Sequence, residues 1–413
     1  MAQVTRQTGA PRALVIGGSM SGLLSALALA RGGFDVEVFE RVDGALAGRG
    51  AGIVAQPQLI EVFRKVGLAP DGELGVHVSE RHMFDLAGRC THRTRCAQIM
   101  TSWDRVFDLL KTAFPATRYH GATELSRIDQ SGTGVTAHFA DGSRAEGDIL
   151  VGADGIRSTV RQLFLPDVTP RYAGYTAWRG LIAEAAFPPG LHAALFEIFA
   201  FCLPPSEQML GYPVAGPDND LRPGHRRYNF VWYRPASEHE ELPRLLTDDR
   251  GRTHALSIPP PLIAKGVIAA MRADAERVLA PQFREMMRLA TQPFLQPIYD
   301  IAVPRMAFGR VALLGDAAFV ARPHVGAGVA KAAEDALALA DALAEAPDVE
   351  SALRRFEAAR LGIGHRIIAR ARHLGAYVQA ERRTAEERVS AERHRTPEAV
   401  LAETATLDFL SEP

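Results

Sequence analysis

The chain has 413 residues, of which 47% are hydrophobic and 23% charged, an ordinary balance for a soluble globular protein. That length allows two or three packed units, or one domain interrupted by an insertion. The 47 basic and 48 acidic side chains give a net charge of −1, so we expect no general affinity for nucleic acid or an anionic membrane. Binding specificity must then come from a local site.

Neither a membrane span nor a metal site is expected. No stretch approaches the roughly 18 uninterrupted apolar residues that a span requires, and the residues before Ala13 lack the pattern of a secretion signal. Cys90, Cys96 and Cys202 are too few for a disulfide framework, and no His or Cys pair has zinc-ligand spacing. We therefore predict a cytoplasmic protein with reduced thiols and no metal.

The first strong pattern is a strand, a glycine-rich turn and a helix near the N-terminus. Residues 13–16 form a short apolar run, as expected of a buried parallel strand, and residues 17–22, GGSMSG, follow directly. A helix over residues 23–31 precedes a second strand over residues 35–40, which ends in Glu40. This order is typical of a dinucleotide-binding unit.

Each part of this unit has a physical role toward a dinucleotide. Gly17 allows a tight turn and Gly22 lets helix and strand approach, while the N–H groups at the helix start attract a pyrophosphate. Glu40 can accept hydrogen bonds from ribose hydroxyls, and its charge repels a 2′-phosphate. Ser19 replaces the usual middle glycine; its side chain takes some space but can bond the phosphate. The unit alone does not distinguish NAD from FAD, and a lone glycine pattern also occurs as a plain turn.

A second glycine-containing turn follows a hairpin over residues 135–146. The apolar run over residues 149–151 predicts a buried strand that enters Gly152-Ala153-Asp154-Gly155, and a helix starts near Ser158. Because Asp and Gly are common in turns, this run is ambiguous by itself.

The most informative run is residues 315–335, GDAAFVARPHVGAGVAKAAED. It follows a predicted strand over residues 310–314 and leads into a long helix from about residue 329. The carboxylate of Asp316 can accept hydrogen bonds from ribitol hydroxyls, and the helix N-terminus can stabilise negative charge on a reduced flavin. The run therefore favours FAD as the cofactor.

In this order the three motifs resemble those of the single-component flavoprotein aromatic hydroxylases, the para-hydroxybenzoate hydroxylase family. The resemblance covers about residues 12–365 and is strongest with the hydroxypyridine-hydroxylating branch, which also lacks the family's usual histidine at Phe319. It implies an α/β fold with a Rossmann-like FAD-binding domain at residues 1–72, 97–166 and 296–345. An inserted antiparallel-sheet substrate domain is expected at residues 73–96 and 167–295, where aromatic β runs occur. A C-terminal helical region at residues 346–413 completes the prediction.

For the cofactor, the resemblance implies an extended FAD, with Glu40 at the adenosine ribose, Arg41 near the adenine and glycines beside the flavin ring. Arg105 matches a helix arginine that reaches the flavin chain; the alternative is an exposed arginine paired with Asp104 or Asp108. NADH or NADPH would bind only transiently, because no second dinucleotide unit appears. The predicted cofactor contacts are Gly17, Ser19, Met20, Ser21, Gly22, Glu40, Arg41, Gly50, Gly52, Arg105, Asp154, Asp316, Gly326, Ala327 and Gly328.

The implied reaction is hydroxylation of a hydroxylated aromatic or N-heteroaromatic ring with NAD(P)H and O₂, through a flavin hydroperoxide. A base near the ring hydroxyl would aid it, so His324 is predicted as base or substrate anchor; a histidine bonded to backbone in a tight loop is the alternative. Arg322 is a weaker candidate, because it could simply hold a carboxylate elsewhere. Tyr212 and Tyr233 could orient the ring, or could belong to the core.

The residues from Leu361 onward interleave arginines and glutamates, which predicts a helix packed on the FAD domain or on a second copy of the chain in a homodimer. Two rival functions are an NAD-linked dehydrogenase and a flavin-binding protein without hydroxylase activity. The first leaves Asp154 and Asp316 unexplained. The second predicts NAD(P)H oxidation that no phenol-like compound stimulates.

Overall fold

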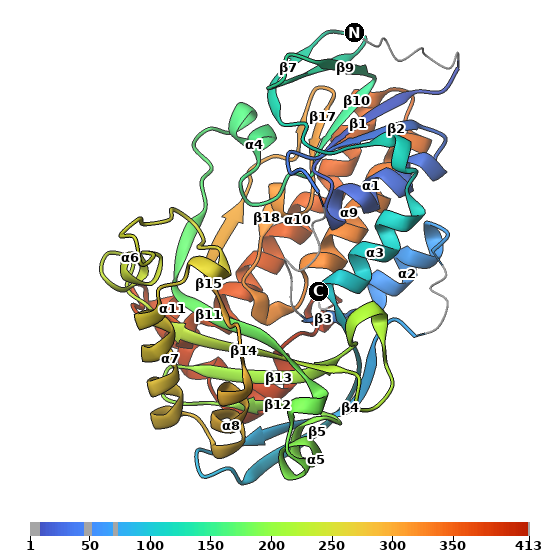
Figure 1. Ribbon diagram of the computed structural model, residues 1–413. Coiled ribbons are helices and arrows are strands. Elements are labelled where there is room, and N and C mark those ends of the chain that lie inside the picture. The colour runs from blue at the N-terminus through green and yellow to red at the C-terminus, as the bar shows by residue number, and fades with distance from the viewer. Residues whose placement is uncertain (1–8, 45–51, 69–72, 412–413) are drawn as a thin grey trace.

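The computed structural model describes residues 9–44, 52–68 and 73–411. It contains two main sheets, with β1, β2, β10 and β17 at one end of the molecule and β11–β14 at the other (Figure 1). Gly50, one of the predicted cofactor contacts, lies outside the described residues.

The first sheet has six strands in the order β16-β17-β10-β1-β2-β6. The five strands from β17 to β6 run parallel to one another, whereas β16 pairs antiparallel with β17. The short apolar runs of the sequence become strands buried on both faces, as a parallel sheet requires. The strands are β1 (Arg12–Ile16), β2 (Asp35–Phe39), β6 (Tyr119–His120), β10 (Ile149–Gly152), β16 (Ala307–Phe308) and β17 (Val311–Leu313).

Helices of the same unit follow the predicted motifs. Helix α1 begins at Met20, three residues earlier than predicted, because the end of the glycine-rich run is already helical. It packs on α9, which in turn packs on α2 and α10. The predicted hairpin is confirmed as β8–β9 in a separate three-stranded sheet. The elements are α1 (Met20–Arg31), α2 (Pro57–Lys65), α3 (Trp103–Ala113), α4 (Thr159–Phe164), α9 (Gly328–Glu345), β7 (Leu125–Gln130), β8 (Val135–Phe139) and β9 (Arg144–Gly147).

The second sheet has nine strands in the order β18-β15-β11-β14-β13-β12-β4-β5-β3. All its pairs among the described residues are antiparallel except β4 with β12, which confirms the predicted sheet type with one exception. Among the aromatic runs of residues 167–295, the one that begins at Leu195 becomes a strand only from Ile198, because Leu195 ends helix α5. The strands are β3 (Gly52–Ala55), β4 (Val76–Phe84), β5 (Cys90–Ser102), β11 (Arg171–Ala183), β12 (Ile198–Cys202), β13 (Gln208–Val214), β14 (Arg227–Pro235), β15 (Phe294–Ala302) and β18 (Phe319–Val320).

The two faces of this sheet contribute to different cores. One face, with Trp178 and Trp232, packs on α5, α7 and α8. The other, with Tyr175 and Tyr233, packs on residues of the C-terminal region. Strand pairing crosses the predicted domain boundaries, since β3 and the end of β5 belong to this sheet. The helices on the first face are α5 (Pro189–Leu195), α7 (Lys265–Val278) and α8 (Pro281–Leu289).

The C-terminal region is helical, as predicted, but its first helix starts earlier than residue 361. Helix α10 (Val349–Gly375) is capped by the Asp348 side chain and packs on α9 of the first unit. Helices α11 (Ala385–His394) and α12 (Pro397–Glu403) follow. Among the helices of the described ranges, none has the length and apolar character to cross a membrane. Within the same ranges, no cluster of His, Cys, Asp and Glu side chains could hold a metal ion.

Candidate active site

The three glycine-containing motifs meet at the ends of β1, β10 and β17. A β-carbon at Gly17 would lie closer than 3.0 Å to the Ala153 carbonyl, and one at Gly315 equally close to Ser21 Oγ. The φ angles of these glycines, +105° and +56°, are also ones that other residues adopt only at a cost. The first motif therefore touches both of the others, as a single nucleotide site requires.

The start of α1 is free to bind an anion. Gly22 lies against the carbonyl of Gly17, with no room for a β-carbon. Ser19 is the N-cap, and its side chain makes no capping hydrogen bond, so among the described residues no N-cap side chain occupies the N–H groups of the first turn. Ala327, the N-cap of α9, likewise offers none. The side chain of Met20 is buried, so only its backbone can face a ligand.

Glu40 follows β2 and lies beside this turn. Its buried carboxylate accepts hydrogen bonds from the N–H groups of Gly18 at 2.8 Å and Val42 at 2.9 Å. Each carboxylate oxygen has a second lone pair, so ribose hydroxyls can still donate to it. Arg41 is exposed beside it. The hydroxyl of Tyr119, which the sequence did not single out, donates to the Gly18 carbonyl at 3.2 Å.

Asp154 bonds its own turn through both carboxylate oxygens. Its Oδ1 accepts from the Ser158 hydroxyl and its Oδ2 from the Val160 N–H at 3.1 Å, which caps α4. Burial raises the pKa of Asp154, and these hydrogen bonds oppose that shift. Its side chain thus shapes the second motif, and direct contact with the cofactor stays a prediction.

The carboxyl group of Asp316 is desolvated by the protein around it. The side chain is exposed to solvent, yet the surrounding protein raises its pKa by desolvation, partly offset by Lys331. Arg105 presents a second group suited to a ligand, because its Nε is buried without a hydrogen-bond partner in the described part of the chain. An unsatisfied buried donor costs about 1–3 kcal/mol. The residues present therefore fit FAD, whose ribitol and phosphate oxygens would satisfy both groups.

A buried ionic network stabilises the third motif. Lys331 Nζ donates to the Gly315 carbonyl at 3.1 Å and to Asp335 Oδ2 at 2.9 Å. Arg360 Nε donates to Asp335 Oδ1 at 2.7 Å. Although burial alone raises it, these two cations lower the pKa of Asp335 overall. The network holds Gly315 against the first motif, and Arg360 is a member that the sequence did not reveal.

His324 is buried among aromatic side chains of the nine-stranded sheet. Its Nε2 lies 3.1 Å from the Tyr175 hydroxyl, and its ring centroid lies 4.2 Å from that of Tyr233. Burial, and then the charge of Arg322, lower the pKa of His324 to about 3. The imidazole is therefore neutral near pH 7 and a weak base, and its role as base or substrate anchor stays a prediction.

This neutral histidine makes the protein sensitive to acid. Because the unfolded chain binds the proton near pH 6.5 and the folded chain near pH 3, stability falls as pH drops below 6.5. Between pH 7 and pH 4.5 the unfolding free energy of the wild type should fall by about 2–3 kcal/mol more than that of His324→Gln, which lacks the titrating group. Urea titrations at both pH values measure this, with the exposed His77→Gln as control. If the unfolding free energies of wild type and His324→Gln fell by the same amount over this pH range, the lowered pKa of His324 would be contradicted.

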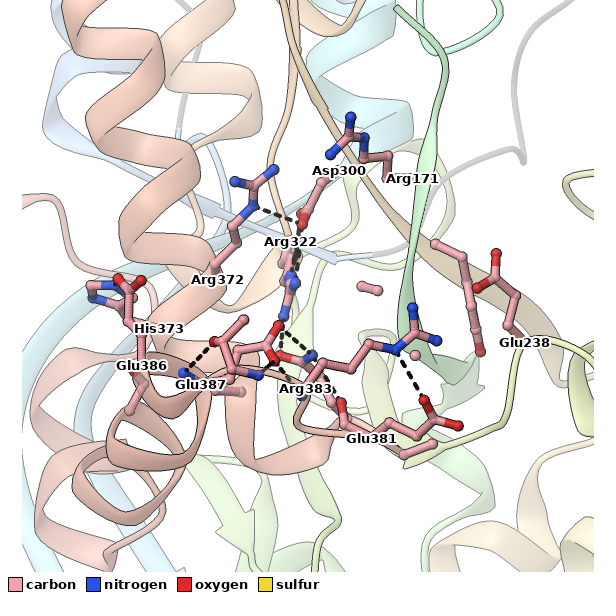
Figure 2. Close-up of a pocket in the computed structure, with 18 of the residues that line it drawn as sticks. Arg171, Glu238, Asp300, Arg322, Arg372, His373, Glu381, Arg383, Glu386 and Glu387 are labelled. Carbon is pink, nitrogen blue, oxygen red and sulfur yellow. Dashed lines mark hydrogen bonds and ion pairs between the residues drawn. The ribbon is translucent and has the colours of Figure 1, made fainter.

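Arg322 holds a carboxylate, which is the alternative to a catalytic role that the sequence analysis gave for it. Its Nε and Nη2 donate to Asp300 at 3.2 and 3.0 Å, and its Nη1 donates to Gln379 at 2.9 Å. Figure 2 shows Asp300, Arg322 and Arg372 in a cavity of about 450 Å³ between the start of β11, the end of α10 and the first turns of α11. None of the predicted cofactor contacts lines this cavity.

Gly52, a predicted cofactor contact, begins β3 and is bonded to a residue of β14. Its N–H donates to Asn229 Oδ1 at 2.9 Å, and a β-carbon there would lie 2.5 Å from the Tyr212 ring. Tyr212 and Tyr233 are both buried in the core of this face, and burial raises the pKa of Tyr212 to about 12. The charge of Arg179 lies close enough to Tyr212 and Tyr233 to oppose the rise in their pKa, although burial has the larger effect. The sequence analysis did not identify Asn229 and Arg179 as site residues, because alternate positions of aromatic strands are expected to belong to the hydrophobic core.

Comparison with known proteins agrees with this geometry. The model of the FAD binding domain family matches residues 11–169 and 296–371, and an FAD binding domain-like family matches residues 172–300. The chain belongs to the FAD-dependent monooxygenases. This monooxygenase is 33% identical to 2,6-dihydroxypyridine 3-monooxygenase of Paenarthrobacter nicotinovorans over 89% of the chain and 91% of the relative. It is 27% identical to 6-hydroxynicotinate 3-monooxygenase of Bordetella bronchiseptica over 80% and 82%.

Solved structures show the same fold. The 2,6-dihydroxypyridine-3-hydroxylase from Arthrobacter nicotinovorans matches with a TM-score of 0.84 and 32% identity, over 90% of this chain and 93% of that one. HpxO of Klebsiella pneumoniae, complexed with FAD and uric acid, matches with a TM-score of 0.75 and 23% identity over 97% of both chains. The resemblance to flavoprotein aromatic hydroxylases and their hydroxypyridine branch is confirmed, as is FAD as cofactor. Neither comparison supports an NAD-linked dehydrogenase.

Proposed function

We propose that this monooxygenase inserts one oxygen atom of O₂ into a hydroxylated N-heteroaromatic ring of the hydroxypyridine type. The balanced reaction is ring–H + O₂ + NAD(P)H + H⁺ → ring–OH + H₂O + NAD(P)⁺. Bound FAD supplies the electron transfer and oxygen activation. The observation that carries the proposal is the neutral His324, which lies within the third motif and packs against Tyr175 and Tyr233. The printed activities of the relatives, on a dihydroxypyridine and a hydroxynicotinate, support the substrate class.

The first unit would hold the cofactor along the contacts predicted from sequence. Glu40 binds the adenosine ribose and the start of α1 binds the pyrophosphate, where the N–H groups have no side-chain cap. Asp316 and Arg105 bind the central chain of the cofactor. The start of α9, behind Gly326, Ala327 and Gly328, faces the flavin ring. NADH or NADPH binds transiently, without a second dinucleotide-binding unit in the described residues.

The side chains on the sheet face would bind and orient the ring. Tyr212 and Tyr233 are protonated at neutral pH, so their hydroxyls can donate hydrogen bonds to a ring oxygen. Since Nε2 of His324 lies 3.1 Å from the Tyr175 hydroxyl, Nδ1 is the nitrogen that would bond the substrate ring, as donor or acceptor according to the tautomer. The charge of Arg179 favours the deprotonated ring hydroxyl, which is the more nucleophilic form. Burial of these groups excludes water from the reacting ring.

The deciding experiment measures aerobic oxidation of NADH and NADPH across a panel of hydroxypyridines and phenols, with product mass under ¹⁸O₂. We expect faster oxidation with hydroxypyridines and a ring product that gains one ¹⁸O atom. If no ring compound accelerates oxidation, the protein binds flavin without acting as a hydroxylase. If phenols are hydroxylated and hydroxypyridines are not, the reaction class stands and the proposed substrate class fails.

Replacing His324 by alanine tests the anchor directly. We expect the FAD content to stay at the wild-type level and product formation to fall at least tenfold, or about 1.4 kcal/mol in the barrier. The substrate ring would lose its hydrogen-bond partner, and the Tyr175 hydroxyl would lose its contact with His324 Nε2. Flavin absorbance and product quantification measure the two effects, with His77→Ala as an exposed control. Unchanged turnover in His324→Ala would remove the proposed role.

A further inference from the structure

The chain after α12 returns to the His324 loop and contacts it through one backbone residue. The N–H of Ala405 donates to the carbonyl of His324 at 2.8 Å. The carbonyl of Ala405 accepts hydrogen bonds from Gln56 Nε2 at 3.0 Å and from Gln98 Nε2 at 3.1 Å. Gln56 precedes α2 and Gln98 lies on β5, so Ala405 joins the third motif to the first unit and to the large sheet.

Ala405 holds an unusual backbone conformation. Its φ is +53°, in the left-handed region that residues other than Gly, Asn and Asp seldom adopt. It packs directly on Gly326, where a β-carbon would lie 2.8 Å from the Ala405 side chain. Residues in such conformations persist only where their surroundings fix them, and they cluster at functional sites. Buried on all sides, Ala405 is such a residue.

The segment before Ala405 is itself anchored to the large sheet. The guanidinium of Arg81, fully buried on β4, donates to the Leu401 carbonyl at 2.6 Å. The same guanidinium donates to Gln98 Oε1 at 2.7 Å, which turns the Gln98 amide nitrogen toward Ala405. Val400 and Leu401 pack into the core on this face of the sheet. The position of Ala405 is therefore set by the sheet that carries Tyr212 and Tyr233.

We propose that Ala405 is a positioning residue, which holds the loop from His324 to Gly326 at a fixed place relative to the substrate-facing sheet. The inference rests on the proposed function of that loop. It adds that the C-terminal segment belongs to the active-site architecture, although Ala405 touches neither substrate nor cofactor. Its N–H and its left-handed backbone are the two properties that this role needs.

Two substitutions at this position separate those properties in the FAD-loaded full chain. Ala405→Pro removes the N–H and forces a negative φ, whereas Ala405→Gly keeps the N–H and accepts a positive φ. With Ala405→Pro we expect peptides covering residues 320–330 to exchange amide hydrogens at least tenfold faster. We also expect the share of NAD(P)H that yields ring product to fall at least threefold, with hydrogen peroxide making up the difference. Ala405→Gly should stay within twofold of wild type in both measurements, as should the exposed control Ala402→Gly.

Hydrogen exchange keeps this test independent of the substrate. If the wild type hydroxylates no ring compound, the proposed function fails, while exchange over residues 320–330 still reports on the loop. Unchanged exchange there in Ala405→Pro would overturn the positioning role, as would an Ala405→Gly variant as mobile as Ala405→Pro. Should Ala405→Pro not fold, Gln56→Leu decides, because it removes the bonds to Ala405 and Gly326. Faster exchange in Gln56→Leu then supports the proposal, and wild-type exchange rejects it.

Discussion

Replacing Gly22 by alanine is expected to give a protein that purifies without FAD. The new β-carbon would lie far inside contact distance of the Gly17 carbonyl oxygen, which is backbone and cannot rotate away. Helix α1 must then move away from β1, and its first N–H groups leave the position that a pyrophosphate needs. Loss of those charge-assisted bonds should weaken FAD binding at least a hundredfold, or about 2.7 kcal/mol. The ratio of flavin to protein absorbance measures retention, and titration of apoprotein with FAD gives the affinity.

Gly362→Ala provides the matched control. It also adds one methyl group to a helix, but no atom lies within 4 Å of the added carbon. Alanine should favour that helix by up to about 1 kcal/mol and leave FAD binding unchanged. A Gly22→Ala protein with a full complement of FAD would show that helix and strand need not approach so closely.

The largest effect on stability is expected from Asp335→Asn. The substitution keeps the shape of the side chain but removes the carboxylate that pairs with the buried ammonium of Lys331, and it leaves the guanidinium of Arg360 with Glu334 alone. Breaking a buried ion pair in this way costs about 3–5 kcal/mol. Because Gly315 loses its support, FAD binding should weaken as well. Urea unfolding of the apoprotein measures the first effect, and FAD titration measures the second.

The pH dependence of the Asp335 network gives a second check. The pKa of Asp335 is lowered in the folded state, so its contribution is complete above the ordinary value of 3.8 and is lost as pH falls below it. Asp335→Asn should therefore differ most from wild type near neutrality and least in strong acid. The exposed pair Glu350–Arg354 serves as control, and Glu350→Gln should cost at most about 1 kcal/mol. An Asp335→Asn protein as stable as the control would disprove the role of the network.

The features predicted best from sequence are those whose signal is local. The strand, glycine turn, helix and Glu40 of the first motif occupy 28 consecutive positions, from Ala13 to Glu40, and hydrophobic periodicity places them without knowledge of the rest of the fold. The hairpin β8–β9 follows from its turn residues in the same way. Sheet type was also accessible, because aromatic alternation predicts antiparallel strands.

Contacts between distant segments were not accessible. Tyr175 and His324 are 149 positions apart, and no pattern in either segment names the other as its partner. The same holds for Arg360 and Asp335, since an arginine in a long charged helix is most often exposed. Only burial showed that the pKa of His324 is lowered to about 3, because a sequence gives the unperturbed pKa. Ala405 had no signal at all, since alanine is among the residues least expected at a positive φ.

The alternation along β14 has a consequence for how substrate choice can change in this fold. Tyr228, Phe230 and Trp232 point into the core against the helices, whereas Val231 and Tyr233 belong to the opposite face. Every second position of one strand can therefore be varied while the core against the helices keeps its composition. A library restricted to Asn229, Val231 and Tyr233 should yield folded proteins at high frequency. We expect it to explore new ring systems where a library at the intervening positions would mostly yield aggregates.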